Sequence, residues 1–135
     1  FLEYAEVYGN FYGTPKMEVM DMMNAGIDVV LEIDIQGALQ IKEAYPEAVF
    51  IFILPPSMSE LRKRITGRGS ETEESLELRL GETLNEIAYI DKYDYCVVNG
   101  ELQDAVNRVT AIIMAEHSRV SEDVYKIIER YKEEL

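Results

Sequence analysis

The sequence contains almost none of the residues that build disulfides and protein metal sites. It has one cysteine, Cys96, one histidine, His117, and no tryptophan. A single cysteine cannot close a disulfide within the chain, and these two residues cannot supply the ligands of a structural zinc site. Both are therefore interpreted as structural. No stretch approaches the roughly 18 apolar residues that a membrane-spanning helix needs, and no charged-then-apolar signal opens the chain. The default expectation is a cytoplasmic protein.

Basic residues are also scarce. The chain carries 13 Lys and Arg against 26 Asp and Glu, a formal net charge of −13. Such a polyanion repels nucleic acids and anionic membranes at long range, so neither is expected as a partner, and an anionic ligand must be bound locally. Of the 13 Lys and Arg, four fall within seven residues, at Arg62, Lys63, Arg64 and Arg68, with Arg79 close behind. Short charge runs are usually solvated helix faces, and Arg62 and Lys63 are assigned to one.

Hydrophobic patterning predicts the fold class. At 135 residues and 47% hydrophobic content, the chain has the size of one domain. Three short apolar runs have the composition of buried strands, at residues 28–34, 49–54 and 95–98. Helical patterns separate them, and this alternation predicts an α/β fold in which helices cover both faces of a parallel sheet.

Helix boundaries can be predicted from capping residues and from glycine and proline. The expected features are a helix at 15–25 that ends before Gly26, a helix from about Gln36 that stops before Pro46, capping boxes that begin at Ser57 and Ser70, and a C-terminal helical stretch from Leu102 that breaks near 118–121.

Two further segments carry polar side chains where a ligand could bind. Residues 3–14 alternate apolar and polar side chains and turn at Gly9, which predicts a small sheet. Asp34 ends the first apolar run, at the edge of a parallel sheet where ligands bind, although a helix-capping role for Asp34 is an open alternative. Glu32 shares its face by strand period, and two carboxylates on one buried strand favour a polar site.

The segments EYAEVYGNFYGT, LEIDIQG, IFILPP, LRKRITGRGSETEESLELRL and YDYCVVN follow the order and spacing found in guanylate kinases. The chain resembles that family from residue 1 to about residue 120, and later residues look like a variable tail. The resemblance implies an α/β fold like that of the P-loop nucleoside monophosphate kinases. It implies a partial GMP-binding subdomain at 1–18, an incomplete core at 19–59 and 91–135, and a helical lid at 60–90.

The resemblance also implies how GMP is bound. Glu3 matches the glutamate that accepts hydrogen bonds from the guanine ring, Thr14 the residue that contacts the guanine carbonyl, and Tyr12 the tyrosine that reaches the GMP phosphate. Guanine presents two adjacent N–H donors, which suit the two oxygens of a carboxylate. Asp34 matches an aspartate near GMP and the water shell of magnesium, whereas Glu32 stands where relatives often carry Asp and has only a weak case.

Three arginines match the lid positions that close over both nucleotides: Arg64, Arg68 and Arg79. Phosphoryl transfer needs charge neutralisation and positioning, and guanidinium groups provide both. Asn99, after the last apolar run, matches a residue at the adenine pocket. These matches imply transfer of phosphate from MgATP to GMP, with Mg²⁺ arriving on ATP and its main ligands outside this chain.

One expected motif is missing. The chain contains no Gly-Lys pair, so it lacks the Gly-x-x-x-x-Gly-Lys-Ser/Thr loop that holds ATP phosphates. It opens with Phe1-Leu2 rather than Met, which favours a missing upstream region. The isolated chain is therefore expected to be inactive. A non-catalytic, guanylate-kinase-like protein-interaction module is the alternative, and a homo-oligomer, in which a second chain covers an exposed strand edge, also stays open.

Overall fold

The computed structural model describes residues 3–7, 10–14, 16–67, 69 and 72–135. In chain order the elements are β1 (Glu3–Val7), β2 (Asn10–Thr14), α1 (Lys16–Asn24), α2 (Ile35–Ala44), β3 (Ile51–Leu54), α3 (Met58–Thr66), α4 (Glu73–Ile87), a 3-10 turn (Ile90–Lys92), β4 (Tyr95–Val98), α5 (Leu102–His117) and α6 (Glu122–Glu133).

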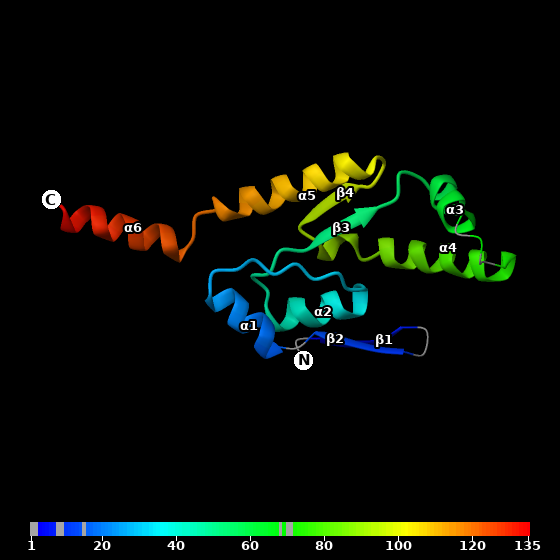
Figure 1. Ribbon diagram of the computed structural model, residues 1–135, viewed down its shortest axis with the longest axis horizontal. Coiled ribbons are helices and arrows are strands. Elements are labelled where there is room, and N and C mark those ends of the chain that lie inside the picture. The colour runs from blue at the N-terminus through cyan, green and yellow to red at the C-terminus, as the bar shows by residue number, and fades with distance from the viewer. Residues whose placement is uncertain (1–2, 8–9, 15, 68, 70–71) are drawn as a thin grey trace.

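The centre of the fold is the parallel pair β3 and β4. The register runs from Ile51 opposite Tyr95 to Leu54 opposite Val98. Asp94 extends the pairing at its start, because its carboxylate accepts a hydrogen bond of 2.9 Å from the Phe50 amide. In Figure 1, α5 runs along one side of this pair, while α2 and α4 lie on the other side. The α/β fold class with parallel strands between helices is confirmed.

The predicted strand at 28–34 is wrong. Residues 27–34 carry no strand assignment in the structure, and Val30 is 73% exposed. The apolar, β-branched composition of this segment suits a strand, but a strand exists only when its N–H and C=O groups bond to a neighbour. Among the described residues, β3 and β4 pair only with each other, so the segment has no ladder to join.

The small sheet predicted from residues 3–14 is present as an antiparallel hairpin. Glu3 lies opposite Thr14, and Val7 lies opposite Asn10. Residues 8 and 9, which include the predicted turn glycine, are outside the described residues. The hairpin lies beside α2, as Figure 1 shows, and β1 makes the contact.

Local capping explains where the first helices end and begin. After α1, Gly26 adopts a φ of 81°, and the Ile27 amide bonds to the Met22 carbonyl at 3.0 Å, which is the Schellman arrangement. The prediction at Gly26 is confirmed. At α2, the Asp34 side chain accepts from the Gly37 amide at 2.9 Å, and the residue before Pro46 is outside the helix.

The next two helices also begin at hydroxyl caps. Ser57 caps α3 by accepting from the Glu60 amide at 2.9 Å, as predicted. The predicted cap at Ser70 is not the start of α4: Ser70 is outside the described residues, and the cap is Thr72, which accepts from the Ser75 amide at 3.1 Å. Thr72 has the extended backbone that an N-cap requires and directly precedes the first helical residue.

Buried side chains form two clusters, and Phe52 and Val97 are buried on the strands beside them. One is built on Ala38, Ile41 and Phe50 and extends to Tyr93, so it joins α2 to the sheet. The other is built on Ile65, Leu76 and Leu80, where α3 meets α4. The α3–α4 pair thus has apolar contacts of its own and packs as a separate unit beside the sheet.

The end of α5 is attached to β4 by a polar cluster. Glu116 accepts from the Tyr95 hydroxyl at 2.6 Å and from the Arg119 guanidinium at 2.8 Å. The Arg119 bonds, followed by the Tyr95 bond, lower the pKa of Glu116 to about 2. Any stability that this carboxylate supplies is therefore complete above its ordinary pKa of 4.5 and is lost as the pH falls towards 2.

The predicted break near 118–121 is confirmed, because α5 ends at His117 and α6 starts at Glu122. Figure 1 shows α6 extending away from the rest of the molecule at the C-terminal end. The described residues include no helix that is both long and apolar enough to cross a bilayer.

Phe52→Ala should destabilise the fold by about 3–4 kcal/mol, because it leaves a cavity in the centre. Phe52 is buried on β3, and its ring meets the Tyr93 ring edge-on with centroids 4.9 Å apart. Urea denaturation would measure the loss. Ile53→Ala is the matched control, since Ile53 is 48% exposed on the same strand and should cost less than about 1 kcal/mol. Equal losses would contradict this assignment of the core.

Candidate active site

A cavity of about 390 Å³ opens at the carboxyl ends of the two parallel strands. Its walls come from the end of β3, from α3 and α4, and from the residue after β4. The lining residues are Ile53, Pro55, Leu61, Arg64, Ile65, Arg79, Glu82, Thr83, Glu86 and Asn99. The cavity therefore brings together three of the residues predicted from the sequence, namely Arg64, Arg79 and Asn99.

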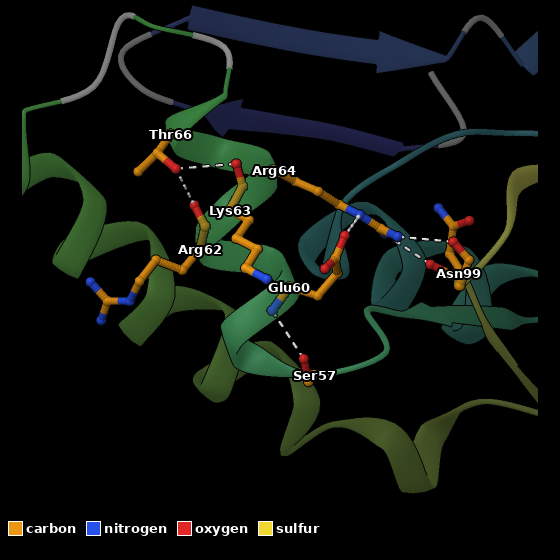
Figure 2. A network of polar contacts seen from close by, with 8 residues as sticks. Ser57, Glu60, Arg62, Lys63, Arg64, Thr66 and Asn99 are labelled. Atoms are coloured by element: carbon orange, nitrogen blue, oxygen red, sulfur yellow. Dashed lines mark hydrogen bonds and ion pairs between the residues drawn. The ribbon is translucent and has the colours of Figure 1, made fainter.

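Arg64 links α3 to the end of β4, as Figure 2 shows. Its Nη1 donates to the Asn99 carbonyl oxygen at 2.8 Å and its Nη2 to the Gly100 carbonyl oxygen at 3.0 Å. Its Nε donates to Glu60 Oε1 at 3.3 Å, one helical turn earlier. The guanidinium is thus held at the cavity wall by groups on two elements. The role of Glu60 was missed in the sequence, although its i, i+4 spacing to Arg64 is a recognisable signal.

The α4 side of the cavity carries charges of both signs. Arg79, Glu82, Thr83 and Glu86 all line it. Their spacing of three, four and seven residues places them on one face of a helix. This helical period, counted from Arg79, is the signal that could have identified the two glutamates from the sequence.

The surroundings of Glu86 disfavour the ionised form of its carboxyl group. Desolvation raises its pKa above the ordinary value of 4.5, and the negative charges of Glu82 and Asp34 raise it further. The pKa of Tyr93 is also raised, first by burial and then by Glu86 and Asp34. The charge of Asp34 thus contributes to the raised pKa of both Glu86, which lines the cavity, and Tyr93.

Asp34 has an observed structural role as the N-cap of α2. The sequence left open whether this residue caps a helix or serves a ligand site, and the structure shows the first without excluding the second. Glu32, two residues earlier, is exposed.

The predicted guanine contacts lie on the hairpin. Glu3 and Thr14 are register partners across β1 and β2, and Tyr12 pairs with Ala5. The backbone therefore brings the first two positions face to face. Arg68 is outside the described residues, so the structure gives no placement for this predicted lid arginine.

The remaining candidates fit structural roles. Arg62 and Lys63 are exposed, and Arg62 Nη2 lies 2.9 Å from Glu77 Oε1 across the α3–α4 contact. Cys96 is exposed on β4, and His117 Nε2 lies 2.6 Å from Asp28 Oδ2 at the surface. Within the described part of the chain, no group of three or more His, Cys, Asp and Glu side chains could hold a metal ion.

Comparison with known sequences gives consistent matches. The family model described as "Guanylate kinase" matches residues 1–116. The chain is 60% identical over 120 residues to the guanylate kinase of Clostridium acetobutylicum, a match that covers 89% of this chain and 57% of that protein. It is 53% identical over 135 residues to that of Clostridium perfringens, covering 100% of this chain and 62% of that protein. The chain thus spans less than two thirds of the length of these relatives.

Comparison of structures agrees. A crystal structure of guanylate kinase from Anaplasma phagocytophilum matches with a TM-score of 0.73 and 38% identity, covering 87% of this chain and 56% of that chain. This likeness, the parallel strands and the cavity at their ends identify the fold of the chain as that of the P-loop nucleoside monophosphate kinases. Within that class, the chain belongs to the guanylate kinase family.

Glu86→Gln should stabilise the protein at about pH 8 but not at about pH 4. Because the pKa of Glu86 is raised, its contribution to stability is complete below the ordinary value of 4.5 and is lost as the pH rises through the raised pKa. Removing the charge relieves this loss, by less than about 1 kcal/mol since the side chain is partly exposed. Thermal denaturation against pH would measure it, with the exposed Glu43→Gln as control. A gain that is equal at both pH values would contradict the proposed cause.

Proposed function

We propose that the protein transfers the terminal phosphate of MgATP to GMP, giving ADP and GDP. One observation carries the proposal: Arg64, Arg79 and Asn99 converge on a cavity at the carboxyl ends of parallel strands, in a chain 60% identical to a curated guanylate kinase. The ATP-phosphate loop, which this chain lacks, would be supplied by residues outside it.

The arginines would neutralise the negative charge of the phosphoryl group as it passes from ATP to GMP. Phosphoryl transfer depends on in-line positioning and on stabilising the charge of the transferring group. Arg64 suits this role because its bonds to the Asn99 and Gly100 carbonyls orient the guanidinium, while other N–H donors stay available for phosphate oxygens. Arg79 and Arg68 would act from α4 and from the connection before it.

The hairpin would select the base. In this proposal Glu3 accepts two hydrogen bonds from guanine, Thr14 contacts the guanine carbonyl oxygen, and Tyr12 contacts the GMP phosphate. The register supports a joint role, because Glu3 and Thr14 face each other across the two strands. Asp34 would lie near GMP and near the magnesium that arrives with ATP.

Residues 60–90 would form the lid, residues 1–18 part of the GMP-binding subdomain, and the remainder the core. The separate apolar cluster of α3 and α4 supports the lid, because a unit with its own buried contacts can move as a body. Closure of the lid over the hairpin would exclude water, so that phosphate passes to GMP rather than to water.

Glu3→Gln in the full-length protein should raise the KM for GMP by roughly 10- to 100-fold, the worth of a hydrogen bond to a charged group. The KM for ATP should change less than about threefold. Steady-state assays of GDP formation would measure both. Glu6→Gln, a carboxylate on the same strand without an assigned role, is the control. Unchanged kinetics for GMP would show that the guanine assignment is wrong.

Two substitutions of Asp34 separate its capping role from its proposed catalytic role. Asp34→Asn should keep the stability of α2, because Asn caps as well as Asp, whereas Asp34→Ala should cost about 1 kcal/mol. If the carboxylate serves the reaction, both variants lose turnover. Parallel measurements of Tm and GDP formation distinguish the outcomes, and full turnover in Asp34→Asn would leave the residue as a cap only.

The alternative function is a non-catalytic protein-interaction module. One observation favours it: the sequence contains no Gly-Lys pair, and therefore no loop of the kind that holds ATP phosphates. ATP-dependent GDP formation by the full-length protein would decide between the two functions, and the 135-residue chain should give none in the same assay. A full-length protein that binds GMP without forming GDP would support the module instead.

A further inference from the structure

The carboxylate of Glu60 does not bond where its place in the sequence predicts. Ser57 and Glu60 have the spacing of a capping box, in which the glutamate side chain returns a hydrogen bond to the backbone amide of the capping residue. The structure shows one half of this box, because the Glu60 amide donates to Ser57 Oγ at 2.9 Å. In the described part of the chain the other half is not formed, and the carboxylate accepts from Arg64 instead. Glu60 therefore serves a side chain of the cavity wall.

The Arg64 guanidinium is held at both ends, as Figure 2 shows in part. Glu60 Oε1 accepts from Nε at 3.3 Å, whereas the Asn99 and Gly100 carbonyl oxygens accept from Nη1 and Nη2 at 2.8 and 3.0 Å. A guanidinium is planar and has five N–H donors, so two donors stay unused, one on each Nη. Contacts at Nε and at the two Nη atoms together fix the plane of the group, and with it the direction of these two donors.

A second ion pair on α3 provides the comparison. Arg62 Nη2 lies 2.9 Å from Glu77 Oε1, with side chains 49% and 58% exposed, and Arg62 is not among the residues that line the cavity. The side chains of Arg64 and Glu60 are less exposed, at 32% and 40%. Exposed ion pairs contribute little to stability. The two pairs thus differ in where the arginine lies, and only the pair of Glu60 ends at the cavity.

We propose that Glu60 is a positioning residue for phosphoryl transfer and acts through Arg64. The inference rests on the function proposed above. The carboxylate fixes the guanidinium before a substrate arrives, so the two unused N–H donors are ready for the oxygens of a phosphate in the cavity. A group that is oriented in advance loses less conformational freedom when the reaction begins. The contact is longer than the roughly 2.7–2.9 Å of a strong charge-assisted bond, so we expect a moderate effect on the rate.

Steady-state assays of GDP formation by the full-length protein test this role. Glu60→Ala should lower kcat by about tenfold, because the guanidinium must then be ordered in each turnover. The KM for GMP should stay within about twofold, since the proposed GMP contacts lie on the hairpin. Glu60→Gln should recover kcat to within about threefold of the wild type, because its amide oxygen still accepts from Nε. A residue that only stabilises α3 would change the Tm and leave this pattern of kcat and KM absent.

A double-mutant cycle shows whether Glu60 acts through Arg64. In an Arg64→Ala background, Glu60→Ala should change kcat by less than about twofold, because no guanidinium is left to orient. Glu77→Ala is the matched control: it removes a carboxylate that pairs with the other arginine, at a shorter distance and on the same α3–α4 unit. Its kcat should stay within about twofold of the wild type. Circular dichroism checks that each variant is folded.

The Nε–H signal of Arg64 in the NMR spectrum of the full-length protein reports the contact without any turnover. In Glu60→Ala this signal should shift, and its proton should exchange faster with solvent, since Nε has lost its acceptor. In Glu77→Ala it should stay where it is in the wild type. The two variants thus separate a loss of the Nε contact from a general loosening of the α3–α4 unit.

Several results would overturn the inference. They are an unchanged kcat in Glu60→Ala, a loss of kcat that is equally large in the Arg64→Ala background, a similar loss in Glu77→Ala, and an Nε–H signal that does not respond to Glu60→Ala. Each of these would leave an active wild type, and with it the proposed function. A full-length wild type that forms no GDP would instead overturn the proposed function and this inference together.

Discussion

The parallel pairing of β3 with β4 is the constraint on which the rest of the structure depends. Because both strands run the same way, their carboxyl ends meet at one edge, and the segments that leave them, towards α3 and α5, start side by side. Asp94 fixes the start of the pairing through the Phe50 amide, and the Asn99 amide continues it by bonding to the Leu54 carbonyl at 2.8 Å. The cavity follows from this geometry.

Arg64 holds the α3–α4 unit against the end of β4. It crosses from α3 to the carbonyl groups just beyond β4, so it connects two parts that have separate apolar clusters. A phosphate at this site would offer the guanidinium a stronger, charged acceptor than a neutral carbonyl. The N–H donors of Arg64 that do not bond to these carbonyls or to Glu60 would bind that phosphate, so the contacts that orient the guanidinium are kept.

Sequence patterns predicted the elements that local chemistry determines. The Schellman glycine Gly26, the cap at Ser57 and the break near 118–121 each depend on neighbouring residues, and all are confirmed. The strand at 28–34 failed because a ladder depends on a partner that composition does not reveal. The arginines were recognised by motif, whereas Glu82 and Glu86 were missed, although they follow Arg79 at helical spacing on the face of α4 that lines the cavity.

The cap at Asp34 has a consequence for the chain around it. Its carboxylate can satisfy the Gly37 amide or turn to a ligand, and the hydrogen bond of 2.9 Å shows which it does in this structure. A ligand that draws the carboxylate away leaves the first turn of α2 with an unsatisfied donor. The amide proton of Gly37 would then report occupancy of the proposed GMP site through its rate of exchange with solvent, although it need not touch the ligand itself.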